Sequence, residues 1–301
     1  MNKRKIAFVG TGIIGSGLAV NTVMHGYDVA MYYRRNFEKL QNSVKSIFDV
    51  FVQNGVCTQE QADGWFGSIL FTMDMEEAVS GAYLVQESIA ENLEMKREMY
   101  RTIQTICGKE TIIASSTTAM MPSDLSEGAL YPQNILVAHP YNPSYLLPLV
   151  ELCGGETADP QMIEEAKAFY ESIGKVALIC RKEVSGYIVN RVNWAVTKEA
   201  RQTVENGLCS VEDMDKAIMY GPGMRMAILG QLLTISLGIP GGFRGRAAKY
   251  GKEPDPNDEL IAAGVDEAML NRLPGTGNSV EEICGYRDKM IIGILKLQGL
   301  L

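Results

Sequence analysis

The sequence has few histidines, no closely paired cysteines and no excess of positive charge. Its two histidines, His25 and His139, and its scattered cysteines give no readable metal site. The six cysteines show no C-x-x-C spacing, which favours reduced thiols in a cytoplasmic protein over a disulfide framework. The 28 basic residues are outnumbered by 36 acidic ones, for a net charge of −8. This balance argues against nucleic acid as a main partner, because phosphate binding needs clustered basic surface.

The N-terminus has the outline of a secretory signal, since a basic start precedes the apolar stretch IAFVGTGIIGSGLAV. Four glycines interrupt this stretch and no A-x-A cleavage site follows it, which weakens that interpretation. The stretch is also too short to span a membrane. With 301 residues, 46% hydrophobic and 21% charged, the chain falls in the ordinary globular range and is long enough for two domains.

A glycine-rich motif, Gly10-Thr-Gly12-Ile13-Ile14-Gly15, lies between an apolar run at 5–9 and a helical pattern at 16–25. The first glycine permits a tight turn, the second allows a pyrophosphate to approach the backbone, and the third lets helix and strand pack closely. The helix N-terminus would face the anion. A chance glycine cluster is the alternative, but the strand before and the helix after it favour a dinucleotide-binding turn.

The second expected strand, at 27–32, lacks the acidic residue that usually binds the adenosine ribose of NAD. Tyr33 stands at the expected acidic position, and Arg34 and Arg35 follow it. Guanidinium groups match phosphate oxygens in two-point geometry, so the pair favours NADP(H), with NAD(H) as the alternative cofactor. Both arginines could also be solvated residues of a loop at the strand end.

Further strand patterns alternate with helical ones along the first 180 residues, which predicts an α/β fold with a Rossmann-type, doubly wound and mostly parallel sheet. A helix at 160 onwards is expected to begin with Asp159 as N-cap and Pro160 at its first position. The remaining patterns predict a helix at 91–107 and strands at 68–72, 83–88, 111–115, 135–138 and 175–180.

His139 is the better candidate for an imidazole base. His25 lies in the last turn of a predicted helix before Gly26, where a cation complements the helix C-terminus. His139 ends an apolar strand, at the edge where doubly wound sheets bind ligands. Glu151 lies twelve residues later within the apolar segment LPLVEL and could fix the imidazole tautomer. A strand-end histidine and a carboxylate paired with an arginine remain the alternative for these two residues.

Four segments together resemble the L-3-hydroxyacyl-CoA dehydrogenase family over most of the chain. His139-Pro-Tyr-Asn142-Pro143 with Leu149-Val150-Glu151 is similar to its H-x-x-N-P and L-V-E segments, and Ser115-Ser116-Thr117-Thr118 to its S-N-T-S-S segment. Its E-x-x-x-E-N-L-x-x-K and P-G-F-I-V-N-R segments resemble residues 87–96 and 185–191.

The resemblance implies an oxidoreductase in which His139 takes the proton of a secondary alcohol while hydride passes to a nicotinamide. Thr118, where the family has serine, keeps the hydroxyl but adds a methyl group that narrows the pocket. Asn190 could instead be an exposed residue of an amphipathic helix. The candidate catalytic residues are His139, Glu151, Thr118 and Asn190, as the resemblance implies. The candidate substrate-binding residues are Thr118, Asn142, Asn190 and Arg225. The candidate cofactor-binding residues are Gly10, Gly12, Ile13, Ile14 and Gly15 of the glycine-rich motif, Tyr33, Arg34 and Arg35 after the second strand, and Glu91, Lys96 and Ser116.

The chain differs in two features from the members of this family that act on acyl-CoA substrates. In both features it resembles the branch that contains L-gulonate 3-dehydrogenase (lambda-crystallin) and carnitine dehydrogenase, whose substrates are free hydroxy acids. The chain lacks a C-terminal G-K-G-F-Y segment, and it carries Arg225 after Gly221-Pro-Gly223. A guanidinium beside the active-site cleft would bind a carboxylate, although an internal salt bridge would explain Arg225 equally. A free 3-hydroxy acid is therefore the expected substrate, with a 3-hydroxyacyl-CoA thioester as the alternative and a non-enzymatic, crystallin-like role as a remote one.

The sequence predicts two domains, a dinucleotide-binding domain at 1–184 and a substrate domain at 185–301. From Gly186 onward the patterns are helical, with breaks at 221–223, 238–245 and 274–277. By resemblance, this second domain would close over the cofactor cleft and form the contact of a homodimer. A small-molecule substrate is expected, with neither nucleic acid nor a membrane as partner.

Overall fold

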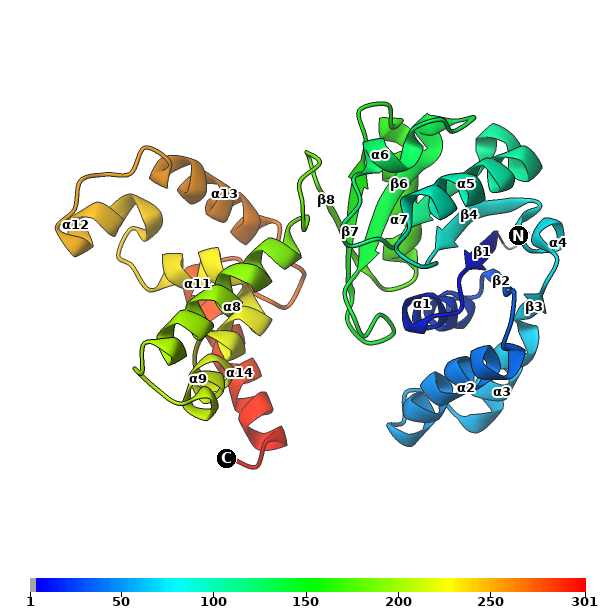
Figure 1. Ribbon diagram of the computed structural model, residues 1–301. Helices are drawn as coiled ribbons and strands as arrows, with labels where there is room; N and C mark the ends of the chain where they lie inside the picture. Colours follow the sequence, from blue (N-terminus) through cyan, green and yellow to red (C-terminus); the bar gives the residue numbers. More distant parts are fainter. Residues whose placement is uncertain (1–3) are drawn as a thin grey trace. The chain divides into compact units, whose positions relative to one another are not determined.

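The computed structural model describes residues 4–301 and divides into two compact units, which meet in sequence between Trp194 and Ala195 (Figure 1). This division falls ten residues after the boundary predicted at 184. Residues 1–3 belong to the basic start of the N-terminal segment that has the outline of a secretory signal, and they lie outside the described residues. Residues 5–24 form a central strand and a helix whose residues 15–23 are buried. No helix among residues 4–301 combines the length and apolarity needed to cross a bilayer.

Residues 4–194 of the first unit form an eight-stranded sheet in the order β3-β2-β1-β4-β5-β6-β7-β8. In this described part of the sheet, only the β6–β7 pair is antiparallel. This arrangement confirms the doubly wound, mostly parallel sheet. The strands are β1 (Lys5–Val9), β2 (Asp28–Tyr32), β3 (Leu70–Thr72), β4 (Ala82–Glu87), β5 (Ile112–Ser115), β6 (Ile135–Pro140), β7 (Leu149–Gly154) and β8 (Val176–Ile179).

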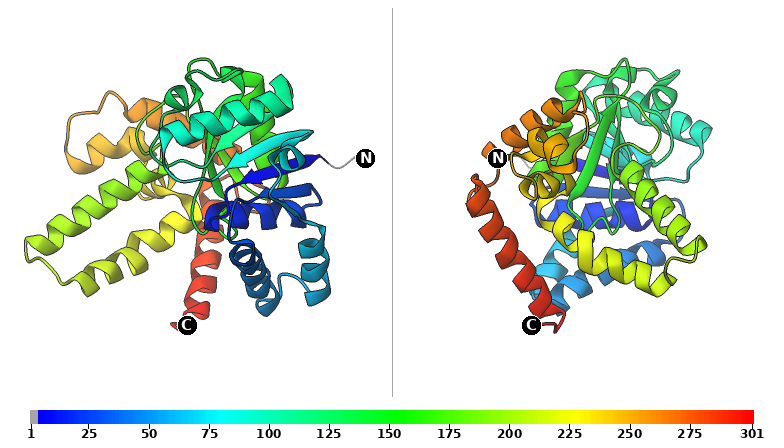
Figure 2. Two further views of the ribbon diagram at one scale, coloured as in Figure 1. Left: turned by 45° about the vertical axis from the view of Figure 1, so that its right-hand side comes forward. Right: turned by 90° about the vertical axis from the view of Figure 1, so that its left-hand side faces the viewer.

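Two apolar layers cover the sheet, because alternate side chains of each strand point to opposite faces. Ile6 and Phe8 pack into one core and Ala7 and Val9 into the other. The first core includes α1 (Ile13–Met24), α2 (Phe37–Gln53), α3 (Gln59–Ser68) and α7 (Pro160–Ser172); the second includes α4 (Met75–Val79), α5 (Leu93–Cys107) and α6 (Pro122–Ser126). Figure 2 shows α1, in blue, and α5, in blue-green, on opposite sides of the strands. Burial on both faces explains why the strands are continuous apolar runs.

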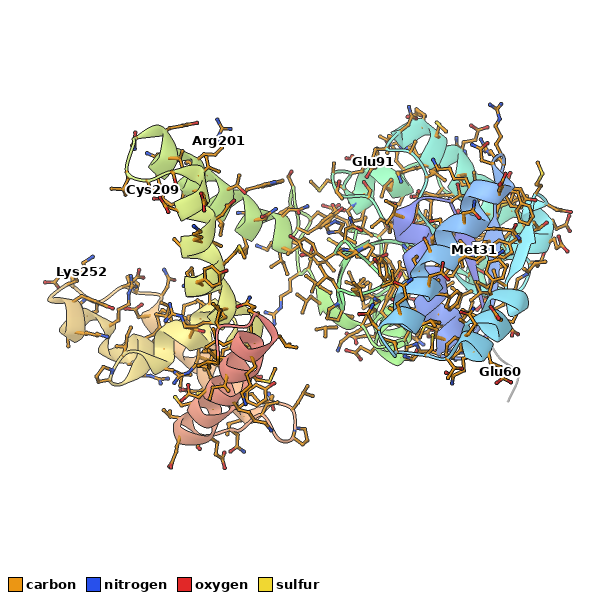
Figure 3. All side chains as sticks on the ribbon, turned by 90° about the horizontal axis from the view of Figure 1, so that it is seen from below. Met31, Glu60, Glu91, Arg201, Cys209 and Lys252 are labelled. Carbon is orange, nitrogen blue, oxygen red and sulfur yellow. The ribbon has the colours of Figure 1, made fainter. Side chains whose placement is uncertain are left out.

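The second unit is helical, as predicted, and continues from α8 (Val189–Glu205), which begins in the first unit. Its core is a small cluster of Leu233, Phe243, Ala262, Val265 and Ile283. Figure 3 shows Cys209 at the turn that follows α8. The other helices are α9 (Val211–Ile218), α10 (Met224–Leu229), α11 (Gln231–Leu237), α12 (Arg246–Tyr250), α13 (Asp258–Leu270) and α14 (Val280–Leu297).

The predicted break at 221–223 is a kink rather than an interruption. A π-helical turn, Met219–Gly223, joins α9 to α10 although it contains Pro222. Gly221, with φ −105° and ψ −108°, departs from helical geometry and absorbs the change of direction. Glycine adopts such conformations more readily than other residues, so the helical path bends here without ending. The breaks at 238–245 and 274–277 do separate helices.

Lys175 is a buried cation that holds the loop after β6. It is 7% exposed, and its Nζ donates to the carbonyl oxygens of Ser144, at 2.5 Å, and Leu147, at 3.3 Å. Burial lowers the pKa of Lys175 to about 8. In the unfolded chain the pKa of a lysine is about 10.4. Between about pH 8 and about pH 10.4 the unfolded state therefore binds more protons than the folded state, and the free energy of unfolding rises with pH.

We therefore expect the stability of the wild type relative to Lys175→Met to rise by about 2 kcal/mol between pH 7 and pH 10. Methionine has no charge to titrate, so the comparison cancels the effects of other ionisable groups. Urea unfolding of both proteins across this pH range would measure the difference. A difference that stays constant with pH would contradict the lowered pKa of Lys175.

Candidate functional site

The glycine-rich turn between β1 and α1 has the geometry expected of an anion-binding turn. Gly10 has φ +124°, and a Cβ there would lie 2.4 Å from the carbonyl oxygen of Ser88. A Cβ on Gly15 would lie 2.7 Å from the carbonyl oxygen of Gly10. Gly12, the N-cap of α1, has no atom within 4 Å of its Cβ position and no capping side chain. The turn is therefore tight where it packs and open at the helix N-terminus, which fits a pyrophosphate group.

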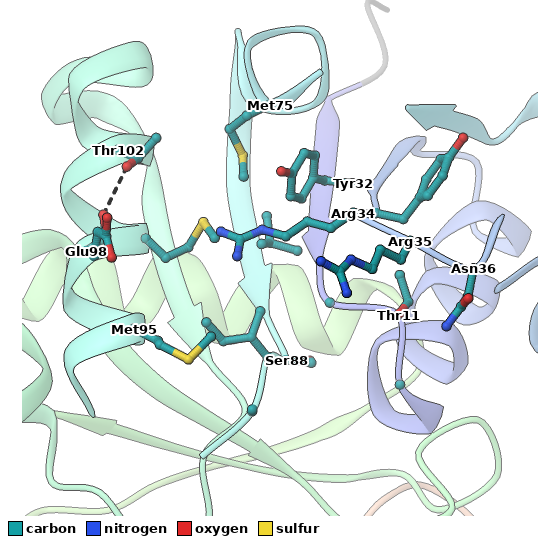
Figure 4. A pocket seen from close by; sticks show the side chains of 17 residues that line it. Thr11, Tyr32, Arg34, Arg35, Asn36, Met75, Ser88, Met95, Glu98 and Thr102 are labelled. Atoms are coloured by element: carbon teal, nitrogen blue, oxygen red, sulfur yellow. Dashed lines mark hydrogen bonds between the residues drawn. The ribbon is translucent and has the colours of Figure 1, made fainter. Parts of the chain in front are cut away.

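A cavity of about 640 Å³ lies beside this turn (Figure 4). The ends of β1 and β2, the loop after β4, and α5 form its walls. Arg34 and Arg35 both line it and are exposed, and within residues 4–301 neither forms a salt bridge. Tyr33 also lines it, with its ring stacked on Phe37 at 4.9 Å between centroids. Arg34 and Arg35, predicted from the sequence to bind the cofactor, thus face the space where the adenosine half of a dinucleotide would fit.

Ile13 and Ile14, predicted to contact the cofactor, occupy the first turn of α1. Ile13 is 63% exposed and Ile14 is half-buried. The carbonyl oxygen of Ile14 accepts a hydrogen bond from Ser144 Oγ at 3.1 Å, so this turn is tied to the loop after β6.

His139 and Glu151 lie opposite each other on the antiparallel strands β6 and β7. His139 Nδ1 is 2.8 Å from Glu151 Oε2, and the two side chains are 5% and 0% exposed. Glu151 Oε1 accepts the backbone N–H groups of Ile188 and Val189, each at 2.8 Å. A carboxylate with these partners requires the proton on Nδ1, which leaves Nε2 of a neutral imidazole free to accept a proton.

Tyr187, which the sequence patterns did not single out, connects His139 to the Thr118 segment. Its ring centroid lies 5.6 Å from that of His139, and its hydroxyl donates to the carbonyl oxygen of Met120 at 2.7 Å. Tyr187 has φ +49°, a left-handed conformation that is rare for an aromatic residue. In the sequence, Tyr187 follows Gly186 within the 185–191 segment that resembles the family's P-G-F-I-V-N-R segment. Exposed Thr118 lies two residues before Met120, and half-buried Asn190 follows Val189.

Glu91 fixes the turn that carries Thr118. Its carboxylate accepts hydrogen bonds from Thr117 Oγ1 at 2.8 Å and from the backbone N–H of Thr118 at 3.1 Å. Figure 3 labels Glu91, whose side chain is 46% exposed. Ser116 Oγ lies 2.8 Å from Gln86 Nε2 and 2.7 Å from Ser88 Oγ. Ser116 thereby ties the end of β5 to the end of β4 beside the glycine-rich turn.

Lys96, predicted to bind the cofactor, has a different environment in the structure. It is 1% exposed, and its Nζ contacts Glu87 Oε1 at 2.6 Å and Glu91 Oε2 at 3.8 Å. Glu87 is fully buried and also accepts the hydroxyls of Tyr100, at 2.5 Å, and Ser115, at 2.7 Å. Because the ammonium is enclosed by these partners, any effect of Lys96 on the cofactor would act through Glu87 and Glu91. A charged residue at the end of the apolar strand β4 was the signal for Glu87.

The structure gives Asn142 and Arg225 exposed positions. Asn142 lies in the loop between β6 and β7, three residues after His139. Arg225 lies in the first turn of α10, and within the second unit it forms no salt bridge. The internal salt bridge that offered an alternative explanation of Arg225 is therefore not found among residues 195–301.

Comparisons of the sequence with known families match both parts of the chain. Residues 5–184 match the family 3-hydroxyacyl-CoA dehydrogenase, NAD binding domain, and residues 186–278 match 3-hydroxyacyl-CoA dehydrogenase, C-terminal domain. The chain is 34% identical to an L-carnitine dehydrogenase from Bacillus cereus over 98% of its length and 92% of the relative. It is 31% identical to an L-carnitine dehydrogenase from Oceanobacillus iheyensis, with 98% of each chain covered.

Solved structures share the fold over nearly the whole chain. A 5-formyl-3-hydroxy-2-methylpyridine 4-carboxylic acid 5-dehydrogenase, described as an NAD+ dependent dismutase, superposes with a TM-score of 0.73 at 25% identity and 99% coverage of both chains. A 3-hydroxyacyl-CoA dehydrogenase from Archaeoglobus fulgidus has the same TM-score at 22% identity. The two family matches together cover residues 5–184 and 186–278, and the relatives match over nearly the full chain. The chain therefore belongs to the 3-hydroxyacyl-CoA dehydrogenase family of oxidoreductases, which act on CH–OH groups with a nicotinamide cofactor.

Proposed function

We propose that this enzyme oxidises the 3-hydroxyl group of a free 3-hydroxy acid, with His139 as the general base and NADP as the preferred cofactor. The observation that carries the proposal is the buried His139–Glu151 pair, with Nδ1 2.8 Å from the carboxylate and no hydrogen bond to Nε2 from residues 4–301. The names of the L-carnitine dehydrogenase relatives support a substrate with a free carboxylate. Exposed Arg225, without a salt bridge in its own unit, is the group proposed to bind that carboxylate.

In the proposed mechanism, His139 Nε2 takes the hydroxyl proton while the carbon–hydrogen bond breaks. Glu151 holds the Nδ1 proton and stabilises the imidazolium that forms. Thr118 and Asn190 are proposed to donate hydrogen bonds to the substrate oxygen as it becomes a carbonyl. A nicotinamide cofactor, held at the glycine-rich turn and the cavity beside it, supplies the hydride acceptor.

The preference for NADP rests on Arg34 and Arg35. No acidic residue stands at the end of β2, and the two guanidinium groups line the cavity without ion-pair partners among residues 4–301. A 2′-phosphate would gain charge-assisted hydrogen bonds there, whereas a 2′-hydroxyl would gain less, because the end of β2 lacks the carboxylate that usually binds it.

We expect the purified enzyme to reduce NADP faster than NAD with a free hydroxy acid. The test measures nicotinamide reduction with L-carnitine, L-gulonate, 3-hydroxybutyrate and 3-hydroxybutyryl-CoA, each with both cofactors. Turnover of one of the free acids with the higher kcat/KM for NADP would support both proposals. Turnover confined to the CoA thioester would overturn the proposed substrate class, and a higher kcat/KM with NAD would overturn the cofactor preference independently.

A 3-hydroxyacyl-CoA thioester is the second candidate substrate, because both matched family domains carry that name. The base and the oxygen-binding residues would act in the same way on either substrate. The two candidates differ at the far end of the molecule, where a free acid presents a charge to Arg225 and a thioester presents none.

We further propose a cytoplasmic homodimer, with domains at 1–184 and 185–301 as the functional division. The six cysteines are free thiols, which suits a reducing compartment. Neither α8 nor α9 has a buried residue, although Val192, Trp194 and Val211 are apolar and more than half exposed. Exposed apolar surface of this kind supports association with a second copy.

A further inference from the structure

The two neighbouring arginines extend into different parts of the cavity beside the glycine-rich turn. In Figure 4 the Arg34 side chain extends toward α5, and its guanidinium lies between Met75 and Met95. The Arg35 side chain is directed to the other part of the cavity, and its guanidinium ends nearer Thr11. Both arginines lie in the bend between β2 and α2, and this one loop supplies two separate cationic groups.

The part of the cavity near Arg35 suits an anion. Gly10, Thr11 and Gly12 line it, and the N-terminus of α1 begins at this turn. The backbone N–H groups and the helix dipole attract negative charge here. Asn36 follows Arg35 in a left-handed conformation, with φ 58° and ψ 50°, and its side chain makes no capping hydrogen bond to α2. Asparagine tolerates this conformation, which turns the chain into α2 directly after the arginine pair.

The part near Arg34 suits an uncharged aromatic ring. Met75 and Met95 supply polarisable thioethers there. Ile89 and Ala90 add apolar surface to the lining of the cavity. Glu98 also lines this part of the cavity and is exposed. Its carboxylate would repel a phosphate group but not an adenine ring, whose amino group is a hydrogen-bond donor. A planar guanidinium stacks readily on such a ring.

We propose that the two arginines bind different chemical groups of the cofactor. Arg35 binds the 2′-phosphate of the adenosine ribose, and Arg34 stacks on the adenine ring. The Arg35 half rests on the proposed preference for NADP. The Arg34 half does not depend on that preference, because NAD and NADP carry the same adenine. Arg34 therefore contributes to affinity for both cofactors, and Arg35 alone determines which of them is preferred.

The proposal is tested by calorimetric titration of NADPH and NADH into the wild type, Arg34→Ala, Arg35→Ala and the control Lys39→Ala. Lys39 is exposed on α2 and does not line the cavity, so its variant removes a nearby positive charge without touching the site. Arg34→Ala should weaken both cofactors by about 5-fold, the value of an exposed cation–π contact, and leave their ratio unchanged. Arg35→Ala should weaken NADPH by about 10-fold to 100-fold, the value of a charge-assisted bond, with little effect on NADH.

Two replacements of Arg34 separate its planar shape from its charge. Arg34→Tyr keeps a flat surface without a charge, whereas Arg34→Lys keeps the charge without the flat surface. We expect the tyrosine variant to bind NADH more tightly than the lysine variant. Tighter binding of NADH by the lysine variant would overturn the stacking role.

The outcomes distinguish this inference from the cofactor preference on which part of it rests. Equal affinity of the wild type for NADPH and NADH would overturn the preference and the role of Arg35, while a 5-fold loss of NADH binding in Arg34→Ala would still support stacking. A wild type that prefers NADPH, with the same loss of preference in Arg34→Ala and Arg35→Ala, would keep the preference and overturn the division between the two arginines.

Discussion

Glu151→Gln should lower kcat by about 10²-fold to 10⁴-fold, the range expected when general base catalysis is lost. Glu151 Oε1 accepts two backbone N–H groups and Oε2 accepts His139 Nδ1. A glutamine that keeps its oxygen on the backbone groups must present its NH₂ to Nδ1. The imidazole then needs its proton on Nε2, where it can no longer take one from the substrate. Steady-state kinetics with saturating cofactor measure the loss.

A double variant separates this positioning role from a purely structural one. If Glu151 acts through His139, then Glu151→Gln added to His139→Gln should cause no further loss of kcat, because residues that act as a unit are not additive. A multiplied loss would contradict the mechanism and indicate damage to the β7–α8 connection. Glu156→Gln is the matched control, since Glu156 is exposed after β7. It should leave kcat within about 2-fold, as surface substitutions generally do.

Most strand positions could be predicted from the sequence because the sheet is buried on both faces. Continuous apolar runs mark such strands, and β1 has the predicted bounds, Lys5–Val9. The start of helix α7 could be predicted equally well from the sequence. Asp159 is its N-cap and accepts a hydrogen bond from the backbone N–H of Gln161 at 2.9 Å, and Pro160 follows as the first helical residue. These features depend on neighbouring residues in the chain, so their signals are local.

Features that depend on contacts between distant segments were not predictable. The burial of Lys96 depends on Glu87, which the fold encloses with Tyr100 and Ser115 from α5 and β5. The same holds for Lys175, whose partners are carbonyl groups of a loop about thirty residues earlier. A lysine in a sequence is normally assigned to the surface, and only the fold shows which ones are enclosed.

The pairing of His139 with Glu151 lies between these cases. His139 ends an apolar run and Glu151 interrupts one, so both could be selected from the sequence as candidate site residues. Their register, directly opposite across β6 and β7, depends on the antiparallel turn of the 141–148 loop. The backbone groups of Ile188 and Val189 that orient Glu151 carry no side-chain signal at all. Sequence patterns thus pointed to the candidate pair His139 and Glu151, and to Glu151 as the group that orients the imidazole, but not to the backbone groups that hold Glu151.

Arg225→Met should raise KM for a free hydroxy acid by about 10-fold to 100-fold, with a smaller change in kcat. A hydrogen bond between charged groups contributes about 1.5–3 kcal/mol, and methionine retains the bulk of the side chain without its charge. Loss of a contact made equally in the ground and transition states appears in KM rather than in kcat. Initial rates at varied acid concentration, with saturating cofactor, measure the effect.

The comparison with Arg201→Met decides whether the effect belongs to the site. Arg201 is an exposed arginine of α8 paired with Glu205 at 2.9 Å, and such a surface pair contributes little. Its variant should keep the wild-type KM, and Arg225→Lys should give an intermediate value because it retains charge but not the two-point geometry. An unchanged KM in Arg225→Met would remove the physical reason for preferring a carboxylate. The thioester would then become the better candidate, because Arg225 is the proposed group that distinguishes the two substrates.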